Sequence, residues 1–105
     1  MRFEVYGIKK SLNDIMRTVG YKPAYFQDDG EFSIVRQLGK NDYPRFHIYI
    51  KELNNSPEEI SEKVLVFNLH LDQKKVSYTG SHAHSGEYDG ELVEKEAKRI
   101  KQFLR

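Results

Sequence analysis

The chain has 105 residues, of which 31% are charged and 38% are hydrophobic, and its 17 basic and 16 acidic residues leave a formal net charge of +1. This length suits one domain, residues 1–105, with a single core, and the near balance of charge argues against a dedicated polyanion binder. The sequence contains no cysteine, which excludes thiolate metal sites, disulfides and cysteine nucleophiles.

A short strand and a helix are predicted in the first 20 residues. Residues 2–6 alternate between apolar and polar side chains, which is typical of a strand. Ser11 followed by Asp14 matches a helix cap with an acid in the first turn, and Gly20 suits a left-handed helix stop. The helix between them has an apolar stripe at helical spacing, made of Leu12, Ile15, Met16 and Val19.

Three strands are predicted in the middle of the chain, separated by turn signals. Asp29-Gly30 favours a tight hairpin turn, and Ser56-Pro57 begins a short helical turn. The strands that these signals separate cover residues 31–38, 45–53 and 64–72.

The last two of these strands can be paired by their side-chain alternation. If they lie antiparallel with Leu53 opposite Val64, the apolar residues of both strands fall on one face. A shift by one residue would place charged side chains in the core. The inward set is Phe46, Ile48, Ile50, Leu65, Phe67, Leu69 and Leu71.

The same register brings polar residues together on the other face. Arg45 lies opposite Asp72, which is a favourable charge pair, and His47 lies opposite His70. We expect this face, which also carries Tyr49, to be open to solvent, to the long loop of residues 73–90 or to a partner. It is then either an ordinary wet surface or a platform on which aromatic and cationic groups bind single-stranded bases.

A second helix is predicted from about residue 90 to residue 104. Asp89 suits its N-cap, and acid–base pairs four residues apart lie on its wet side. Its buried stripe is Leu92, Val93, Ala97, Ile100, Phe103 and Leu104.

The order of elements predicts an α+β fold in two layers, with an antiparallel sheet of four to five strands and the two main helices packed on one face. The order helix–strands–helix is similar to that of double-stranded-RNA-binding modules and of small toxin ribonucleases of the HicA kind. This resemblance is one of topology, because the basic cluster and catalytic pattern of those families are not matched residue by residue. No apolar run approaches the roughly 20 residues of a membrane helix, and no signal core is present at the start. We therefore expect a cytoplasmic protein without a membrane partner.

The densest chemistry lies between Phe67 and Gly90, a segment that holds three of the four histidines. Two of its residues, at positions 70 and 72, lie on a predicted strand and share a face. His82 and His84 are also two residues apart, and Glu87 follows them closely. Imidazole and carboxylate groups in this number suit zinc, iron or manganese, although no zinc signature of two histidines four apart around a glutamate occurs. A divalent-metal site is one interpretation and a structural role is the other. The metal ligands would be His70, Asp72, His82, His84 and Glu87.

Residues 73–90 contain the longest connection without clear periodicity. Connections longer than about 12–15 residues are usually functional or disordered, and basic and aromatic groups beside a helix start suit a phosphate or an RNA backbone. A strand at residues 75–79 would shorten the connection, and the sequence leaves this open. We expect the loop rather than the sheet to carry any activity. The predicted ligand-binding residues are His47, Tyr49, His70, Lys74, Lys75, His82, His84 and Tyr88.

Nucleophilic catalysis has little support in the sequence. Ser81 and Ser85 are each adjacent to a histidine, but neighbouring side chains on an extended chain point apart, and no Gly-x-Ser-x-Gly elbow occurs. His84 alone is a candidate general base for RNA cleavage. The sequence therefore favours a small non-catalytic binding domain for a nucleic acid, a phosphate-bearing ligand or a protein partner. The alternative is a metal-dependent hydrolase or nuclease built on the five metal ligands above.

Overall fold

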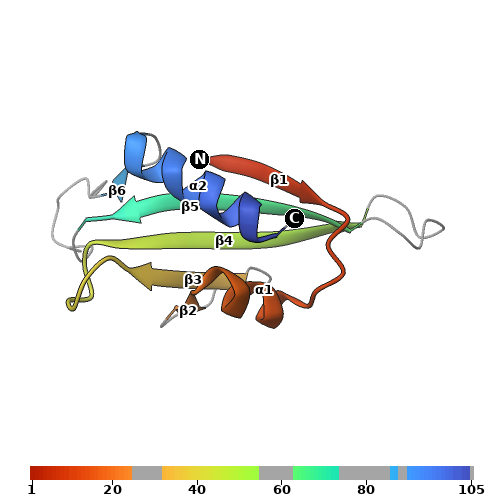
Figure 1. The fold of residues 1–105 in the computed structure, drawn as a ribbon, viewed down its shortest axis with the longest axis horizontal. Helices are drawn as coiled ribbons and strands as arrows, with labels where there is room; N and C mark the ends of the chain where they lie inside the picture. Colours follow the sequence, from red (N-terminus) through yellow and green to blue (C-terminus); the bar gives the residue numbers. More distant parts are fainter. Residues whose placement is uncertain (25–31, 55–62, 74–85, 88–89, 105) are drawn as a thin grey trace, which may run out of the picture.

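The computed structural model describes residues 1–24, 32–54, 63–73, 86–87 and 90–104. Within these residues the first helix follows the first strand, and five further strands precede the final helix (Figure 1). The elements are β1 (Arg2–Tyr6), α1 (Leu12–Val19), β2 (Lys22–Pro23), β3 (Phe32–Gln37), β4 (Arg45–Asn54), β5 (Lys63–Asp72), β6 (Gly86–Glu87) and α2 (Glu91–Phe103).

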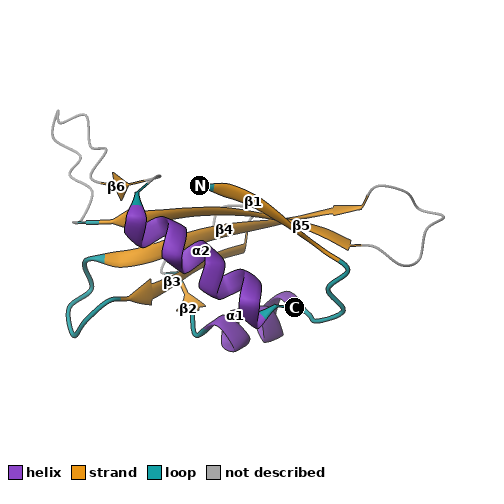
Figure 2. Cartoon of the chain, turned by 45° about the horizontal axis from the view of Figure 1, so that its top comes forward, coloured by secondary structure: helices purple, strands orange, loops and turns teal. Residues whose placement is uncertain are grey.

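One antiparallel sheet with two helices confirms the predicted α+β class. The strands follow the spatial order β1-β5-β4-β3-β2, and β6 also pairs with β5. The central strands β4 and β5 are each ten residues long, whereas β2 has two residues at one edge. In both ribbon views α1 and α2 lie in front of the sheet (Figure 1, Figure 2).

The predicted register of the two long strands is confirmed. Arg45 pairs with Asp72, and His47 pairs with His70. All of the inward residues predicted on these strands belong to the buried hydrophobic cluster. The register follows from the alternation of side chains, because a shift by one residue would expose every one of them.

The predicted limits of the first helix are also confirmed. The Ser11 side chain accepts a hydrogen bond from the backbone N–H of Asp14 at 3.2 Å. Gly20 ends α1 with φ of 82°, a left-handed conformation that favours glycine. Ile15, Met16 and Val19 are buried in the core, so α1 is fixed both by its caps and by its apolar stripe.

The second helix buries a narrower stripe than the sequence predicts. Val93, Ala97 and Ile100 are buried, but Leu92 and Phe103 expose 51% and 52% of their surface. The prediction that these two residues belong to the core is wrong, because only the positions nearest the sheet are covered and Leu92 lies to one side of that line. The helix begins after Gly90, which offers no side-chain cap, and the expected cap, Asp89, lies outside the described residues.

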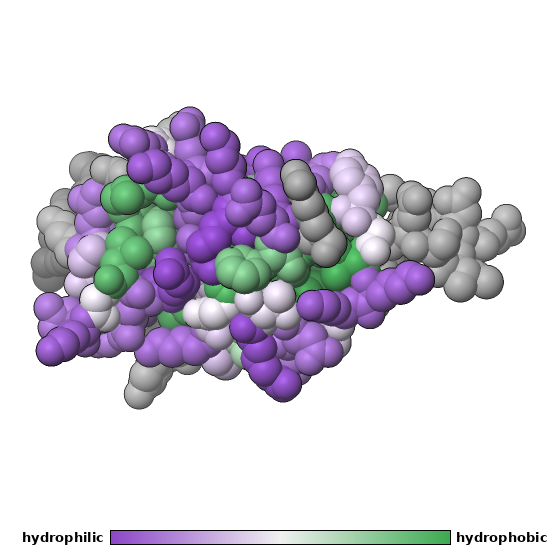
Figure 3. Space-filling model, in the orientation of Figure 1, coloured by the Kyte–Doolittle hydropathy of each residue, from purple (hydrophilic) through white to green (hydrophobic). Residues whose placement is uncertain are grey.

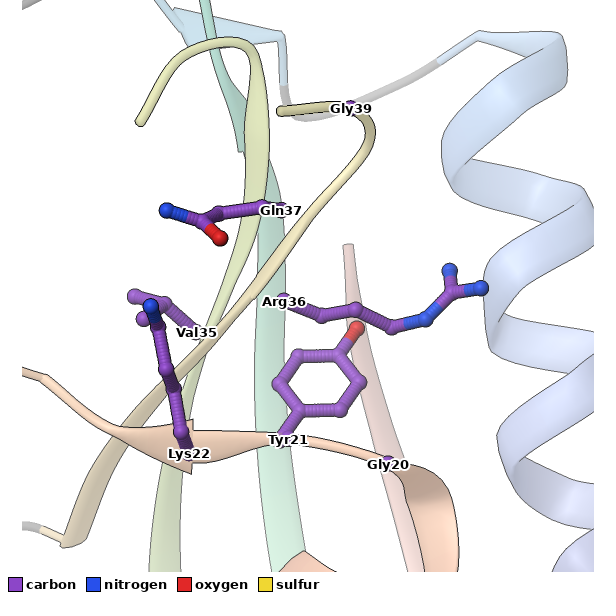
Figure 4. Close-up of a pocket in the computed structure, with 7 residues that line it drawn as sticks. All are labelled: Gly20, Tyr21, Lys22, Val35, Arg36, Gln37 and Gly39. Carbon is purple, nitrogen blue, oxygen red and sulfur yellow. The ribbon is translucent and has the colours of Figure 1, made fainter. Parts of the chain in front are cut away.

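The buried position that completes this stripe is Glu96, which is only 4% exposed. Tyr21 donates its hydroxyl to Oε2 at 2.5 Å, and Arg99 donates to the two oxygens at 2.7 and 2.9 Å. Arg36 approaches Oε1 at 3.5 Å, and its side chain extends toward α2 (Figure 4). Burial and the Glu96 carboxylate raise the pKa of Tyr21 far above its usual range, so its hydroxyl stays a donor. The network links α2 to β3 and to the end of α1.

The surface on the helix side of the molecule is mainly hydrophilic. Hydrophilic residues dominate the face seen in the space-filling view, with small apolar patches between them (Figure 3). Neither of the two helices in the described part of the chain has the length and apolar composition needed to cross a bilayer.

Candidate metal centre

A cluster of polar side chains lies where β3, β4 and β5 run side by side. His47 on β4 and His70 on β5 are directly opposite each other. Asp72 follows His70 by two residues, so its side chain leaves the same face of β5. Ser33 on β3 pairs with Tyr49, two residues from His47 on that face. The sheet register thus brings together residues that are far apart in the sequence.

Asp72 is the centre of this cluster, because each of its carboxylate oxygens contacts a histidine. His47 Nδ1 lies 3.2 Å from Oδ2, and His70 Nε2 lies 2.9 Å from Oδ1. Arg45 Nε also lies 3.5 Å from Oδ2. Burial opposes the charge of Asp72, but the hydrogen bonds from His47 and His70 outweigh it and hold the pKa of Asp72 well below its usual range.

The ionised carboxylate determines which nitrogens of the two imidazoles carry a proton. Because ionised Asp72 can only accept hydrogen bonds, Nδ1 of His47 and Nε2 of His70 carry the protons that they donate. Nε2 of neutral His47 is then an acceptor, and Ser33 Oγ, at 2.6 Å, donates to it. Ser33 is 1% exposed and His47 is 9% exposed, so this hydrogen bond is sheltered from water.

Ring packing holds the two imidazoles in place as well. The Tyr49 ring stacks on His47 with centroids 4.4 Å apart and on His70 with centroids 5.8 Å apart. The two histidine rings are themselves 4.9 Å apart. Their orientation is therefore fixed by contacts on their faces in addition to the hydrogen bonds at their edges.

The cluster has the donor set of a metal site, and two of its three ligand-to-ligand distances are close to the spacing that such a site requires. One ligand atom from each of His47, His70 and Asp72 lies within 4.8 Å of the other two. Ligands about 2.0–2.2 Å from a tetrahedral zinc ion are about 3.3–3.6 Å apart. The two histidine–carboxylate distances of 2.9 and 3.2 Å are already close to this spacing. The two imidazole nitrogens would have to approach each other by at most about 1.5 Å to share one ion.

The structure brings together part of the metal-ligand set predicted from the sequence. His70 and Asp72 are joined, and the third partner is His47, which the sequence placed in the ligand-binding set. The backbone of Glu87 pairs with Leu71, next to Asp72 on β5. The other predicted ligands, His82 and His84, lie outside the described residues, and so do Lys74, Lys75 and Tyr88.

Of the alternatives expected for this face, exposure to solvent is wrong at the cluster. The His70 and Asp72 side chains are 12% and 18% exposed, and Ser33 and His47 are buried. The sequence carried a signal of this, because the apolar residues Val35, Val64 and Val66 lie on the same face as His47 and His70. All three of these valines are buried, whereas a fully wet face would carry polar residues there.

Ser33 is a member of the cluster that the sequence did not reveal. The sequence pointed to serines adjacent to histidines in the chain, whereas Ser33 is 14 residues from His47. Only the pairing of β3 with β4 brings the two together, with Ile34 opposite Ile48. A register derived for that pair, as for β4 and β5, would have placed Ser33 beside the histidines.

Two hollows elsewhere in the described part of the chain lack such a convergent set of groups. One, of about 320 Å³, lies between β2 and β3, where Lys22 and Gln37 extend to one side of the sheet and Arg36 to the other (Figure 4). The second, of about 210 Å³, lies between residues 7–10 and the end of α2. Neither holds a cluster of potential metal ligands.

Comparisons with protein-family models, with curated proteins and with solved structures give no match to this chain.

Proposed function

We propose that this chain is a small binding domain whose ligand is a divalent transition-metal ion held by His47, His70 and Asp72. The observation that carries the proposal is the convergence of two imidazoles and one carboxylate within 4.8 Å on neighbouring strands. Two nitrogen ligands and one oxygen ligand suit zinc, and also iron or manganese. The fourth coordination position is left for water or for another group.

The burial of the cluster favours an ion over a larger ligand. Stacking of nucleic-acid bases requires an exposed aromatic face, but His47 is buried and its ring is covered on one side by Tyr49. A nucleic acid, a phosphate-bearing ligand or a protein partner therefore gains no support from this part of the sheet.

A metal-dependent hydrolase or nuclease is the second candidate, because it would use the same three ligands. Catalysis requires an open coordination position that substrate can reach. The His70 and Asp72 side chains are 12% and 18% exposed, which favours holding an ion over turning over a macromolecule. Hydrolysis of a phosphodiester by the zinc-loaded protein, lost in His70→Ala, would favour the enzyme instead.

Zinc binding to the purified full chain tests the proposal directly. We expect one zinc ion per chain by calorimetry and by metal analysis after dialysis. Both His70→Ala and Asp72→Asn should weaken binding by at least about 100-fold, which is more than the loss of a group outside the ligand shell costs. Asn68→Ala is the matched control, because Asn68 is exposed on the same face of β5, two residues before His70. The proposal fails if the parent chain binds no divalent metal, or if His70→Ala binds it as tightly as Asn68→Ala.

A further inference from the structure

We propose that Ser33 is a positioning residue of this centre, which exchanges its hydrogen bond with His47 when the metal binds. In the metal-free protein the Ser33 hydroxyl donates to Nε2 of His47, and in the loaded protein it accepts from the same nitrogen. This inference rests on the proposed metal site and assigns a role to a residue outside its ligand set.

The first step is the direction of the hydrogen bond in the metal-free protein. His47 Nδ1 faces Asp72 at 3.2 Å, and the carboxylate is an acceptor. The single proton of a neutral imidazole is therefore on Nδ1, and Nε2 has a lone pair. Ser33 Oγ lies 2.6 Å from Nε2 and is the group that donates a hydrogen bond to its lone pair.

The second step is what metal binding does to this arrangement. The His47 nitrogen that faces Asp72 is Nδ1, at 3.2 Å, so Nδ1 is the atom that would bind the ion. It gives up its proton to solvent, and Nε2 takes one up, so that the imidazole stays neutral with no net change in protons. Nε2–H now needs an acceptor in a buried place, and Ser33 Oγ is already at hydrogen-bond distance.

The third step is that a hydroxyl group suits both states. A serine hydroxyl has one proton to donate and two lone pairs to accept, so rotation about its C–O bond satisfies His47 before and after binding. Alanine or valine satisfies neither state. Groups that orient a metal-bound histidine through its second nitrogen typically change metal affinity by about 10–100-fold.

The hydrogen-bond order Ser33–His47–Asp72 is also that of a serine hydrolase, but burial argues against this role. A nucleophile must reach substrate, and Ser33 is 1% exposed in the middle of β3. Reaction of Ser33 with a fluorophosphonate probe would overturn the positioning role.

The experiment follows His47 by long-range ¹H–¹⁵N spectra of its imidazole, with and without zinc. We expect a protonated Nδ1 and an unprotonated Nε2 in the metal-free chain, and a protonated Nε2 in the zinc-loaded chain. An unprotonated Nε2 in the loaded chain, or a protonated Nε2 in the neutral metal-free imidazole, overturns the inference. This measurement uses the parent protein and does not depend on any variant folding.

Zinc affinity of three variants provides the second test. Ser33→Thr and Ser33→Val are a matched pair, since they have the same shape and differ in the hydroxyl. We expect Ser33→Val and Ser33→Ala to bind zinc about 10–100-fold more weakly than the parent, and Ser33→Thr to restore binding relative to Ser33→Val. Equal affinities for Ser33→Thr and Ser33→Val overturn the role of Ser33 while the metal site stands. If the parent binds no zinc, both proposals fall.

Discussion

Removal of the Glu96 carboxylate should be the most damaging polar substitution in the described core. Glu96→Ala removes the acceptor that the Tyr21 hydroxyl and the Arg99 guanidinium share. The hydrogen bond from Tyr21 is buried, and the one from Arg99 is partly buried. Breaking a buried charge pair by removing one partner costs about 3–5 kcal/mol. Native domains have only about 5–15 kcal/mol of stability in total, so this single change threatens the fold.

The size of the effect can be checked by thermal and urea unfolding. For a domain near this size each kcal/mol lowers Tm by about 4–8 °C, so a loss of 3 kcal/mol lowers it by about 12–24 °C. Glu94→Ala is the matched control, because Glu94 is exposed on the same helix and such surface changes stay within about 0.5 kcal/mol. A Glu96→Ala variant that unfolds within about 1 kcal/mol of Glu94→Ala would refute the reasoning.

Three further predictions concern the core, the cluster and the loop. Phe67→Ala should cost about 3–5 kcal/mol in urea unfolding, because Phe67 is fully buried and stacks on Phe3 at 5.0 Å; a midpoint equal to that of the parent would contradict this. Asp72→Asn should be destabilising near neutral pH and progressively less so in acid. The folded pKa of Asp72 lies below the ordinary value of 3.8, so the stability that the ionised carboxylate contributes is fully present above pH 3.8 and is lost as the pH falls through the lower folded pKa. A difference in the free energy of unfolding, measured in urea, that does not change with pH would count against this. The sequence also predicts that His82→Ala and His84→Ala weaken zinc binding while Tm stays within a few degrees; early unfolding with normal binding would make these histidines structural.

The parts of the fold that follow from a repeating pattern were predictable. The alternation along β4 and β5 determines which side chains face the core, and the charge pair of Arg45 with Asp72 agrees with the same register. The caps of α1 at Ser11 and Gly20 also have a local physical cause that can be read in the sequence.

The parts that depend on burial across elements were not predictable in the same way. Glu96 occupies a core position of α2, but an acidic residue on a charged helix is ordinarily assigned to the wet side. Its burial becomes favourable only because Tyr21 and Arg36 reach it from elsewhere in the chain. The role of Ser33 was not predictable for the same reason, since only the pairing of β3 with β4 brings Ser33 close to His47.

The two buried polar networks of this sheet differ in what they suggest about function. Glu96 is compensated by a tyrosine and two arginines: the guanidinium groups have no lone pair to offer an ion, and the Tyr21 hydroxyl stays protonated and donates to Glu96. Asp72 is instead compensated by two imidazoles, and each of these can exchange its donated proton for a bond to a metal. Stability alone does not require that choice, because well-packed apolar residues often replace a buried ion pair without loss. The choice of partners at Asp72 therefore supports the proposal of a bound ion over a purely structural role.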